Sequence, residues 1–214
     1  MMSFSFSAHN KLKTSYYKGQ LRIVGGELYH LIGDFESGVQ NYLESILLQL
    51  GDKNAPEFRL DFHKNGKNNT QHFSFQQTYK GLPVFGRYIR VHINDDIITS
   101  FSSNIDTIEL SVFPIITESC ALDIIRPDYI STTTFLKYQI LQIYIQNGLS
   151  HLVHTIDAIN FENSWRYLVD AYSGEIIDSL SLIFEDGPVI GSGINLLSET
   201  VDTLYVYEGS SFIP

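Results

Sequence analysis

The chain has 214 residues, 43% of them hydrophobic, and carries 24 acidic against 14 basic residues, a formal net charge of −10. A chain of this length buries about 70% of its unfolded surface, and its single cysteine excludes an internal disulfide framework. Negative charge without a Lys/Arg cluster excludes nucleic acid as an expected partner, and no run approaches the roughly 20 apolar residues of a membrane span.

The N-terminal region has weak periodicity. We expect the first fifteen residues to be mobile and a strand to cover residues 20–24, before Gly25 and Gly26. A helix is predicted next, because Ser37 to Gln40 resembles a capping box and apolar residues then recur at helical spacing until Gly51. This helix should lay its apolar stripe on a sheet. The stripe contains Val39, Tyr42, Leu43, Ile46, Leu47 and Leu50.

Strands are predicted over residues 58–63 and 73–79, where apolar and polar side chains alternate, with a turn at residues 65–69 between them. The run FSFQQTYKGLPVFGRYIRVHIN, residues 73–94, continues through a turn at Lys80-Gly81-Leu82-Pro83 into a second alternating strand after Gly86. This run is predicted to be an antiparallel hairpin. A polar turn at residues 94–96 and a strand at 97–104 follow.

Pro114 separates the two halves, with the boundary expected between residues 106 and 113. Thr117 is predicted to cap a helix over residues 118–125 that ends near Arg126, because Pro127 disfavours helical geometry in the residue before it. Cys120 is predicted to be a small buried residue of this helix rather than a reactive thiol.

The second half continues as strands. Asn147-Gly148 is a type I′ turn signal between β-rich runs at 136–146 and 149–159. Another strand, 165–169, runs through a turn at 170–174 into residues 175–184. The predicted fold class is α+β, with two consecutive subdomains, each an antiparallel curved sheet packed against a helix, and a C-terminal β extension.

The hairpin at residues 73–94 resembles the fungalysin/thermolysin propeptide motif, in which a Gln-x-x-x-Gly-Leu-Pro-Val-aromatic-Gly core precedes a Val-His-Val-Asn-type strand. These residue types specify a folding module and carry no chemistry of their own. The matching positions are Gln77, Tyr79, Gly81, Leu82, Pro83, Val84 and Gly86.

A second resemblance lies in WRYLVDAYSGEII, which is similar to the hairpin of the PepSY half of thermolysin-type prosequences. Residues from Gly187 onward resemble the opening of the mature enzyme, although Ser198-Glu199 replaces a usual Gly-Asp pair and the next strand is reduced to residues 210–213. The second hairpin matches at Trp165, Arg166, Tyr167, Val169, Asp170, Ala171, Gly174, Glu175 and Ile176.

These resemblances imply four segments. Residues 1–33 form an N-terminal extension, residues 34–110 a fungalysin/thermolysin propeptide-like domain, residues 111–186 a PepSY-like domain, and residues 187–214 a stub of the metalloprotease catalytic domain.

The chain lacks the residues of a zinc peptidase, because none of its histidines begins a His-Glu-x-x-His sequence. His151 and His154, three apart in a strand, should point to opposite faces and not share a metal. Gly191-Ser192-Gly193 is predicted to be a connector, and Asp95 and Asp96 to be solvated turn residues. The pair Glu185 and Asp186 could approach a metal only if this segment threads a zinc-bearing cleft.

The resemblance implies the propeptide of a thermolysin-like zinc metalloprotease, which assists folding of the enzyme and inhibits it in cis or in trans. It predicts no catalytic residue and no cofactor in this chain, since the zinc would belong to the catalytic domain. A processing zone is expected at Phe184, Glu185, Asp186, Gly187 and Pro188, in a Gly/Pro-containing connector.

Two alternatives stay open: a truncated product or stand-alone binding module without protease activity, and the N-terminal part of a full zinc metalloendopeptidase precursor. The family implies a secreted or periplasmic protein. The residues after Met1 lack a signal-peptide core, so a cytoplasmic location is expected if Met1 is the true start.

Overall fold

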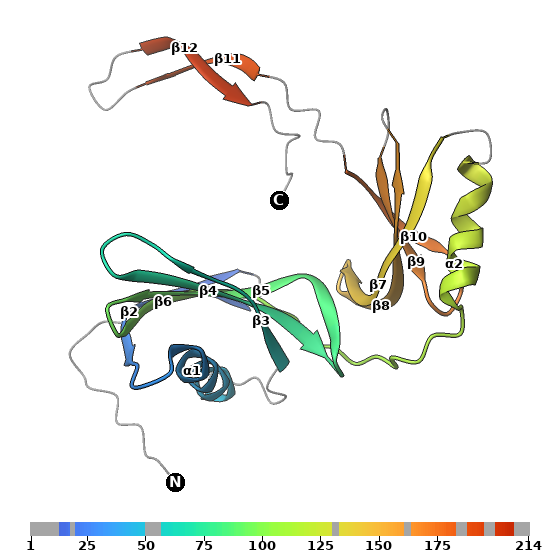
Figure 1. The fold of residues 1–214 in the computed structure, drawn as a ribbon. Helices are drawn as coiled ribbons and strands as arrows, with labels where there is room; N and C mark the ends of the chain where they lie inside the picture. Colours follow the sequence, from blue (N-terminus) through green and yellow to red (C-terminus); the bar gives the residue numbers. More distant parts are fainter. Residues whose placement is uncertain are drawn as a thin grey trace. The chain divides into compact units, whose positions relative to one another are not determined.

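The computed structural model describes residues 13–17, 20–49, 57–129, 133–160, 164–182, 188–194 and 200–207. The chain forms two compact units, residues 1–114 with 141–153, and residues 115–140 with 154–214. The described residues are mostly sheet with two α-helices, so the predicted α+β class is confirmed (Figure 1). The assignment of these units to the four predicted domains stays a prediction.

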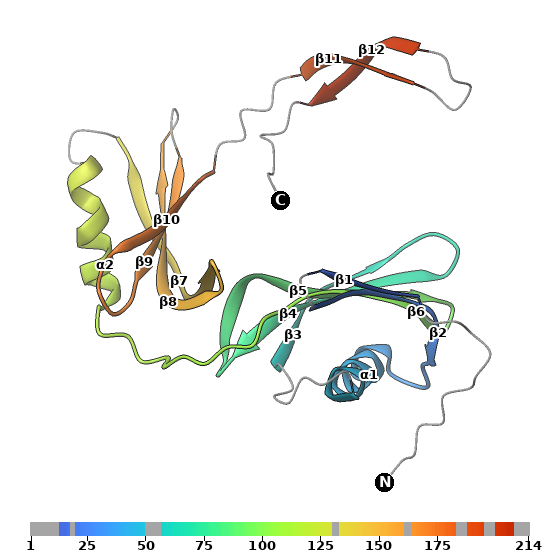
Figure 2. The same cartoon turned by 180° about the vertical axis from the view of Figure 1, so that it is seen from behind.

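The first unit contains a curved antiparallel sheet in the order β1-β2-β6-β5-β4-β3, with helix α1 (Phe35–Gln49) across one face (Figures 1 and 2). The predicted end of the early strand was wrong, since β2 continues through Gly25 and Gly26 to His30. The strands are β1 (Lys13–Tyr17), β2 (Gln20–His30), β3 (Glu57–Asn65), β4 (Thr70–Tyr79), β5 (Leu82–Asn94) and β6 (Ile97–Asn104).

Helix α1 begins earlier than its sequence pattern predicts. The Asp34 carboxylate accepts a hydrogen bond from the Ser37 amide at 2.9 Å, and the Gly38 amide donates to the Asp34 carbonyl. The hydrogen bonds from Ser37 lower the pKa of Asp34. Asp34, rather than Ser37, is therefore the capping residue, because an acceptor at this position satisfies amides that the first turn leaves open.

The described part of the predicted apolar stripe of α1, from Val39 to Ile46, packs on the sheet, and the side chains of Leu47 and Leu50 lie outside the described residues. Val39 and Leu43 are fully buried, and the ring of Tyr42 stacks on Tyr29 of β2 at a centroid distance of 5.3 Å. Burial raises the pKa of Tyr42 to about 12. The buried core comprises Val24, Leu31, Val39, Leu43, Ile46, Phe73, Phe75, Ile89, Val91, Ile93, Ile98 and Phe101.

Helix α2 (Glu118–Ile125) covers the second sheet, whose strands follow the order β7-β8-β9-β10 (Figure 1). Ala121 and Ile125 of the helix pack with Ile156 and Val169 of the sheet. The strands are β7 (Phe135–Gln146), β8 (Leu149–Ile159), β9 (Trp165–Asp170) and β10 (Ile176–Ser181).

The Thr117 cap of α2 is confirmed, since its side chain accepts a hydrogen bond from the Cys120 amide. The buried position expected for Cys120 was wrong: Cys120 is exposed, because it lies off the face that carries Ala121 and Ile125. The helix ends at Ile125 with Arg126 as its C-cap, as predicted. Arg126 nevertheless keeps right-handed helical geometry in spite of Pro127, and the chain continues as a 3-10 helix, η1 (Arg126–Tyr129).

The turn between β7 and β8 is Asn147-Gly148, as predicted, and both residues have positive φ. Residues 141–153, around this turn, group with the first unit. There Val84 of β5 pairs with Ile143 of β7 in parallel orientation, which an antiparallel pattern did not predict.

The C-terminal β extension is present as an antiparallel hairpin of β11 (Pro188–Ile194) and β12 (Thr200–Tyr207). Gly191-Ser192-Gly193, predicted to be a connector, lies within β11. None of the described helices is long and apolar enough to cross a membrane.

Candidate functional site

The hairpin at residues 73–94 turns earlier in the chain than the position of Pro83 predicts. Lys80 and Gly81 both have positive φ, +49° and +81°, and they connect β4 directly to β5. Two consecutive positive φ values are typical of a type I′ turn, whose twist matches that of the flanking strands. Pro83 therefore lies in β5, opposite Thr78, and only Lys80 and Gly81 form the turn.

A large bulge in β5 follows the turn. Gln76 pairs with Tyr88 but Thr78 pairs with Pro83, so residues 84–87 of β5 stand opposite Gln77 alone. Gly86 has a φ of +67°, a conformation that costs side-chain-bearing residues about 1–2 kcal/mol. The Gly-Leu-Pro-Val-Phe-Gly run therefore completes the turn between β4 and β5 and then forms the bulge in β5.

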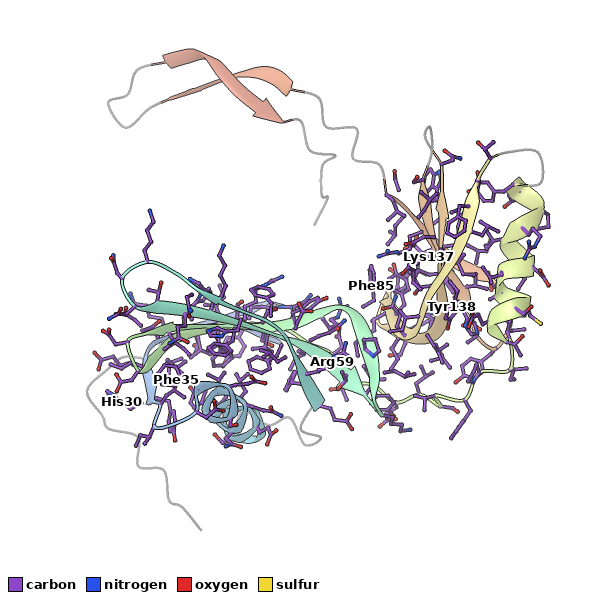
Figure 3. The ribbon with its side chains drawn as sticks, viewed as in Figure 1. His30, Phe35, Arg59, Phe85, Lys137 and Tyr138 are labelled. Carbon is purple, nitrogen blue, oxygen red and sulfur yellow. The ribbon has the colours of Figure 1, made fainter. Side chains whose placement is uncertain are left out.

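The bulge contacts the tip of the β7–β8 hairpin. Val84 is fully buried and pairs with Ile143, and the Phe85 ring, labelled in Figure 3, meets Tyr144 edge-on at a centroid distance of 5.8 Å. The motif therefore joins segments about 60 residues apart in the chain within the first unit.

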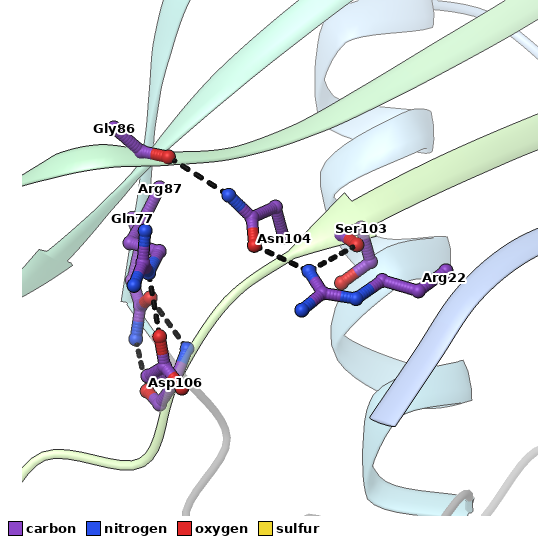
Figure 4. A network of polar contacts seen from close by, with 7 residues as sticks. All are labelled: Arg22, Gln77, Gly86, Arg87, Ser103, Asn104 and Asp106. Carbon is purple, nitrogen blue, oxygen red and sulfur yellow. Dashed lines mark hydrogen bonds and ion pairs between the residues drawn. The ribbon is translucent and has the colours of Figure 1, made fainter. Parts of the chain in front are cut away.

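Gln77 binds the segment that leaves β6 (Figure 4). Its amide nitrogen donates to the Asp106 carbonyl at 2.6 Å, and its amide oxygen accepts from the Asp106 amide at 3.1 Å. Arg87 holds the carboxylate of the same residue at 2.5 Å. Because Gln77 is only 3% exposed, the two bonds satisfy polar atoms that water does not reach, and we call this arrangement the Gln77 clamp.

A second set of contacts in Figure 4 fixes the bulge itself. The side-chain nitrogen of Asn104 donates to the Gly86 carbonyl at 3.0 Å, and its oxygen accepts from Arg22, which also donates to the Ser103 carbonyl. These contacts join β2, β5 and β6 at one end of the sheet.

Tyr79 and Lys80 hold the next part of the chain. The Tyr79 hydroxyl accepts from the Leu110 amide at 3.4 Å, and the Lys80 ammonium donates to the Leu110 carbonyl at 3.1 Å. Hydrogen bonds from Lys80 and from the Leu110 backbone lower the pKa of Tyr79. The polar motif residues thus anchor residues 106–110 on the hairpin.

The second motif contains a buried carboxylate. Arg166 on β9 donates twice to Asp157 on β8, at 2.7 and 2.9 Å, and Gln139 on β7 donates to the same carboxylate at 2.7 Å. The Asp157 side chain is 6% exposed, and its hydrogen bonds and charge raise the pKa of Arg166. This carboxylate ties three strands together.

Asp170 and Gly174 form the turn after β9. The Asp170 carboxylate accepts from the amides of Tyr172 and Ser173, and Gly174 has a φ of +78°. A Cβ on Gly174 would lie 3.0 Å from the Ile124 side chain of α2, a tight contact, so both the positive φ and the space favour glycine here. Trp165 begins β9 and is partly buried.

His154 of β8 is held by local contacts. His154 is 3% exposed, and one ring nitrogen lies 2.7 Å from the Ile116 carbonyl while the other lies 3.2 Å from the Tyr138 hydroxyl. A carbonyl only accepts, so Nε2 of His154 carries a proton and is unavailable to a metal. No group of three potential metal ligands occurs among the described residues.

The turn carboxylates have structural partners. The Asp95 carboxylate accepts from the Asn69 side chain at 3.0 Å, and the Asp96 carboxylate lies 3.8 Å from Nδ1 of His30. The other carboxylate pair, Glu185 and Asp186, lies outside the described residues. So does the processing zone at Phe184, Glu185, Asp186 and Gly187, and Pro188 begins β11.

Sequence reasoning found the motif positions but missed the residues that they bind. Asp106, Asn104 and Asp157 are single polar residues without a pattern of their own, and each becomes important through a contact distant in sequence. The side chains of the two motifs form polar anchors of the fold.

Comparison with known proteins matches residues 62–105 to the fungalysin/thermolysin propeptide motif. The chain is 25% identical over 170 residues to the bacillolysin of Brevibacillus brevis, and 25% identical over 168 residues to neutral protease B of Bacillus subtilis strain 168. The chain resembles the propeptide region of thermolysin-like proteases.

These matches cover 70% and 68% of this chain but 31% of each relative, so the chain spans about a third of the length of the curated relatives. The Bacillus megaterium YpeB C-terminal domain is 13% identical, with a TM-score of 0.38, and the match covers 80% of this chain and 76% of that one. The propeptide motif runs from Phe62 in β3 to Ile105, and Asp106 of the Gln77 clamp follows directly.

Proposed function

We propose that this chain is the propeptide of a thermolysin-like zinc metalloprotease and acts as a folding assistant and inhibitor of that enzyme. The match of residues 62–105 to the propeptide motif carries this proposal. The similarity to two proteases over about 70% of the chain supports it. The zinc and the catalytic residues would belong to the enzyme.

The proposed folding role depends on a propeptide surface that is already folded before it meets the enzyme. A folded propeptide presents a fixed surface to a partly folded enzyme, and the ordering cost of that surface has already been met within its own sheets. The Gln77 clamp and the Asp157–Arg166 pair contribute to this rigidity. When propeptide and enzyme are one chain, their high effective concentration makes binding strong, and cleavage of the connector lowers it.

The proposal includes three further statements about the precursor. Residues 111–186 are a PepSY-like domain, cleavage occurs in the zone at residues 184–188, and the precursor is secreted or periplasmic. A cleavage site in the connector predicts an enzyme that begins at or near β11. N-terminal sequencing of the products of a processed precursor would locate that bond.

The second candidate function is that of the N-terminal part of a full zinc metalloendopeptidase precursor. The match to only 31% of the length of each relative favours it. A His-Glu-x-x-His sequence in adjoining coding sequence would decide for this candidate. A stand-alone module without a protease is the remaining alternative.

Refolding tests the folding role. A mature thermolysin-like protease, such as the catalytic part of neutral protease B, is denatured and diluted with or without the purified chain. We expect the chain to raise the yield of native enzyme, scored after the chain is removed. Serum albumin at the same concentration is the control, and an equal yield with both proteins would contradict the folding role.

A further inference from the structure

The sheet of the first unit has one face on α1 and an opposite face that no described helix of this unit covers (Figures 1 and 3). Directly paired residues of antiparallel strands point to the same side. Arg59 pairs with Gln76, and Lys64 with His72, whereas the alternate residue Phe75 is in the core. The same pairing places Arg90 opposite Ser74 and His92 opposite Ser100 on this uncovered face.

Four exposed cations lie on this face: Lys13, Arg59, Lys64 and Arg90. Lys13 joins them because it pairs with Gly25, which pairs with Ser100. We call this surface the cationic face, and it includes His72 and His92. Two carboxylates lie on or near it: Glu57, which pairs with Thr78 two residues from Arg59, and Asp61, whose charge acts on the nearby Tyr88. Among the residues that these pairings place, four cations against two carboxylates give the face a sign opposite to the formal charge of −10 of the chain.

The arginines of the cationic face have neutral neighbours. Arg59 donates to the Gln76 side chain at 3.3 Å, and the Arg90 guanidinium lies 5.7 Å from the centroid of the Tyr88 ring. Neither arginine takes part in an ion pair between the described side chains. Their positive charge is therefore not compensated by a carboxylate within hydrogen-bond reach.

Polar groups at the centre of the face are incompletely paired. Ser74 is 1% exposed, and its hydroxyl has no hydrogen-bond partner among the described residues. Nδ1 of His72 lies 2.7 Å from Nδ1 of His92, so one ring donates to the other. An exposed sheet face with an excess of cations is suited to a partner that carries carboxylates.

We propose that the cationic face docks onto an acidic surface patch of the thermolysin-like protease domain, which rests on the proposed function. A protein patch brings a local group of carboxylates against this face. An extended polyanion, such as DNA or an anionic membrane, would also approach the acidic remainder of the chain and be repelled by it. Charge complementarity therefore selects a protein surface.

The test compares three forms of the full chain for binding to an immobilised mature thermolysin-like protease, blocked with an active-site inhibitor if needed to prevent digestion. The first is the unmodified chain. The second carries Arg59→Glu and Arg90→Glu. The third carries Arg126→Glu and Lys137→Glu, which reverse two exposed cations of the second unit. Circular dichroism verifies folding, and Arg59→Gln with Arg90→Gln replaces the second form if it unfolds.

We expect the reversal at Arg59 and Arg90 to raise Kd by at least about tenfold, because close charge pairs across an interface are replaced by repulsion. The control reversal should change Kd by less than about threefold, and added salt should weaken the unmodified chain more than the Arg59/Arg90 variant. Equal Kd values for the unmodified chain and that variant would overturn the docking assignment alone.

Failure of the unmodified chain to bind would instead overturn the proposed function together with the docking assignment. Vesicles of phosphatidylglycerol and phosphatidylcholine provide a further arm. If these vesicles bind the chain through Arg59 and Arg90 while the protease binds independently of them, the face recognises an anionic lipid surface and the protease assignment is wrong.

Discussion

Replacing Gln77 by Ala tests whether the Gln77 clamp stabilises the first unit. The substitution removes hydrogen bonds of 2.6 and 3.1 Å to the Asp106 backbone from a side chain that is 3% exposed. Each bond contributes roughly 0.5–1.5 kcal/mol net. Because Asp106 is only partly buried and water can reach it in the variant, we expect a loss of about 2 kcal/mol in the free energy of unfolding.

The matched control is Gln76→Ala at the adjacent residue, whose side chain accepts a hydrogen bond of 3.3 Å from exposed Arg59. This control should change stability by about 0.5 kcal/mol or less. Urea unfolding followed by circular dichroism gives the free energies. Hydrogen exchange locates the effect, since the Asp106 amide should exchange about 30-fold faster if its protection is lowered by about 2 kcal/mol. If Gln77→Ala destabilises the chain no more than Gln76→Ala, the clamp is not a stabilising contact.

Three further predictions concern other parts of the fold. Gly86→Ala should destabilise the chain by about 1 kcal/mol because of its positive φ, while Gly25→Ala, whose added Cβ has 3.9 Å of space, should not; equal thermal midpoints would contradict this. Asp157→Asn should lower the free energy of unfolding by about 2–3 kcal/mol, because it weakens a partly buried bidentate pair with Arg166. The exposed control Asp123→Asn should lower it by about 0.5 kcal/mol or less. Fluorescence of the single tryptophan follows unfolding in both variants. Burial and the neighbouring histidine lower the pKa of His92, so the folded chain favours its neutral form, and the stability this contributes is complete above about pH 6.5 and lost as pH falls below that value. His92→Gln should therefore flatten the fall in thermal midpoint from pH 7.5 to pH 5, and an unchanged slope would refute this cause.

Much of the element order follows from local patterns. The strand at 97–104, the helix at 118–125 and the Asn147-Gly148 turn have the predicted bounds. Each depends on neighbouring residues: alternation, a side-chain cap, or a residue pair suited to positive φ. Such signals need no knowledge of the rest of the fold.

The errors arise where a contact overrides local preference. Asp34 begins α1 earlier than the Ser37 pattern, because its carboxylate reaches the Ser37 amide. β2 continues through Gly25 because pairing with β6 and β1 stabilises it there. Arg126 remains helical before Pro127, since sterics of the next proline are a preference and not a prohibition.

The candidate site was only half predictable. Its motif residues, such as Gln77 and Arg166, were identified by resemblance, but their partners Asp106 and Asp157 were not. The large bulge at residues 84–87 depends on the register of β4 against β5, which alternation alone does not fix. The parallel contact of Val84 with Ile143 also depends on tertiary structure.

Inhibition in trans tests the proposed inhibitory role of the chain. Increasing amounts of the full chain are mixed with a fixed amount of mature thermolysin-like protease, and initial rates are measured on a short fluorogenic peptide before the chain can be digested. We predict that activity falls as the chain is added and returns when the complex is diluted. Full activity at a large excess of intact, folded chain would contradict its role as an inhibitory propeptide.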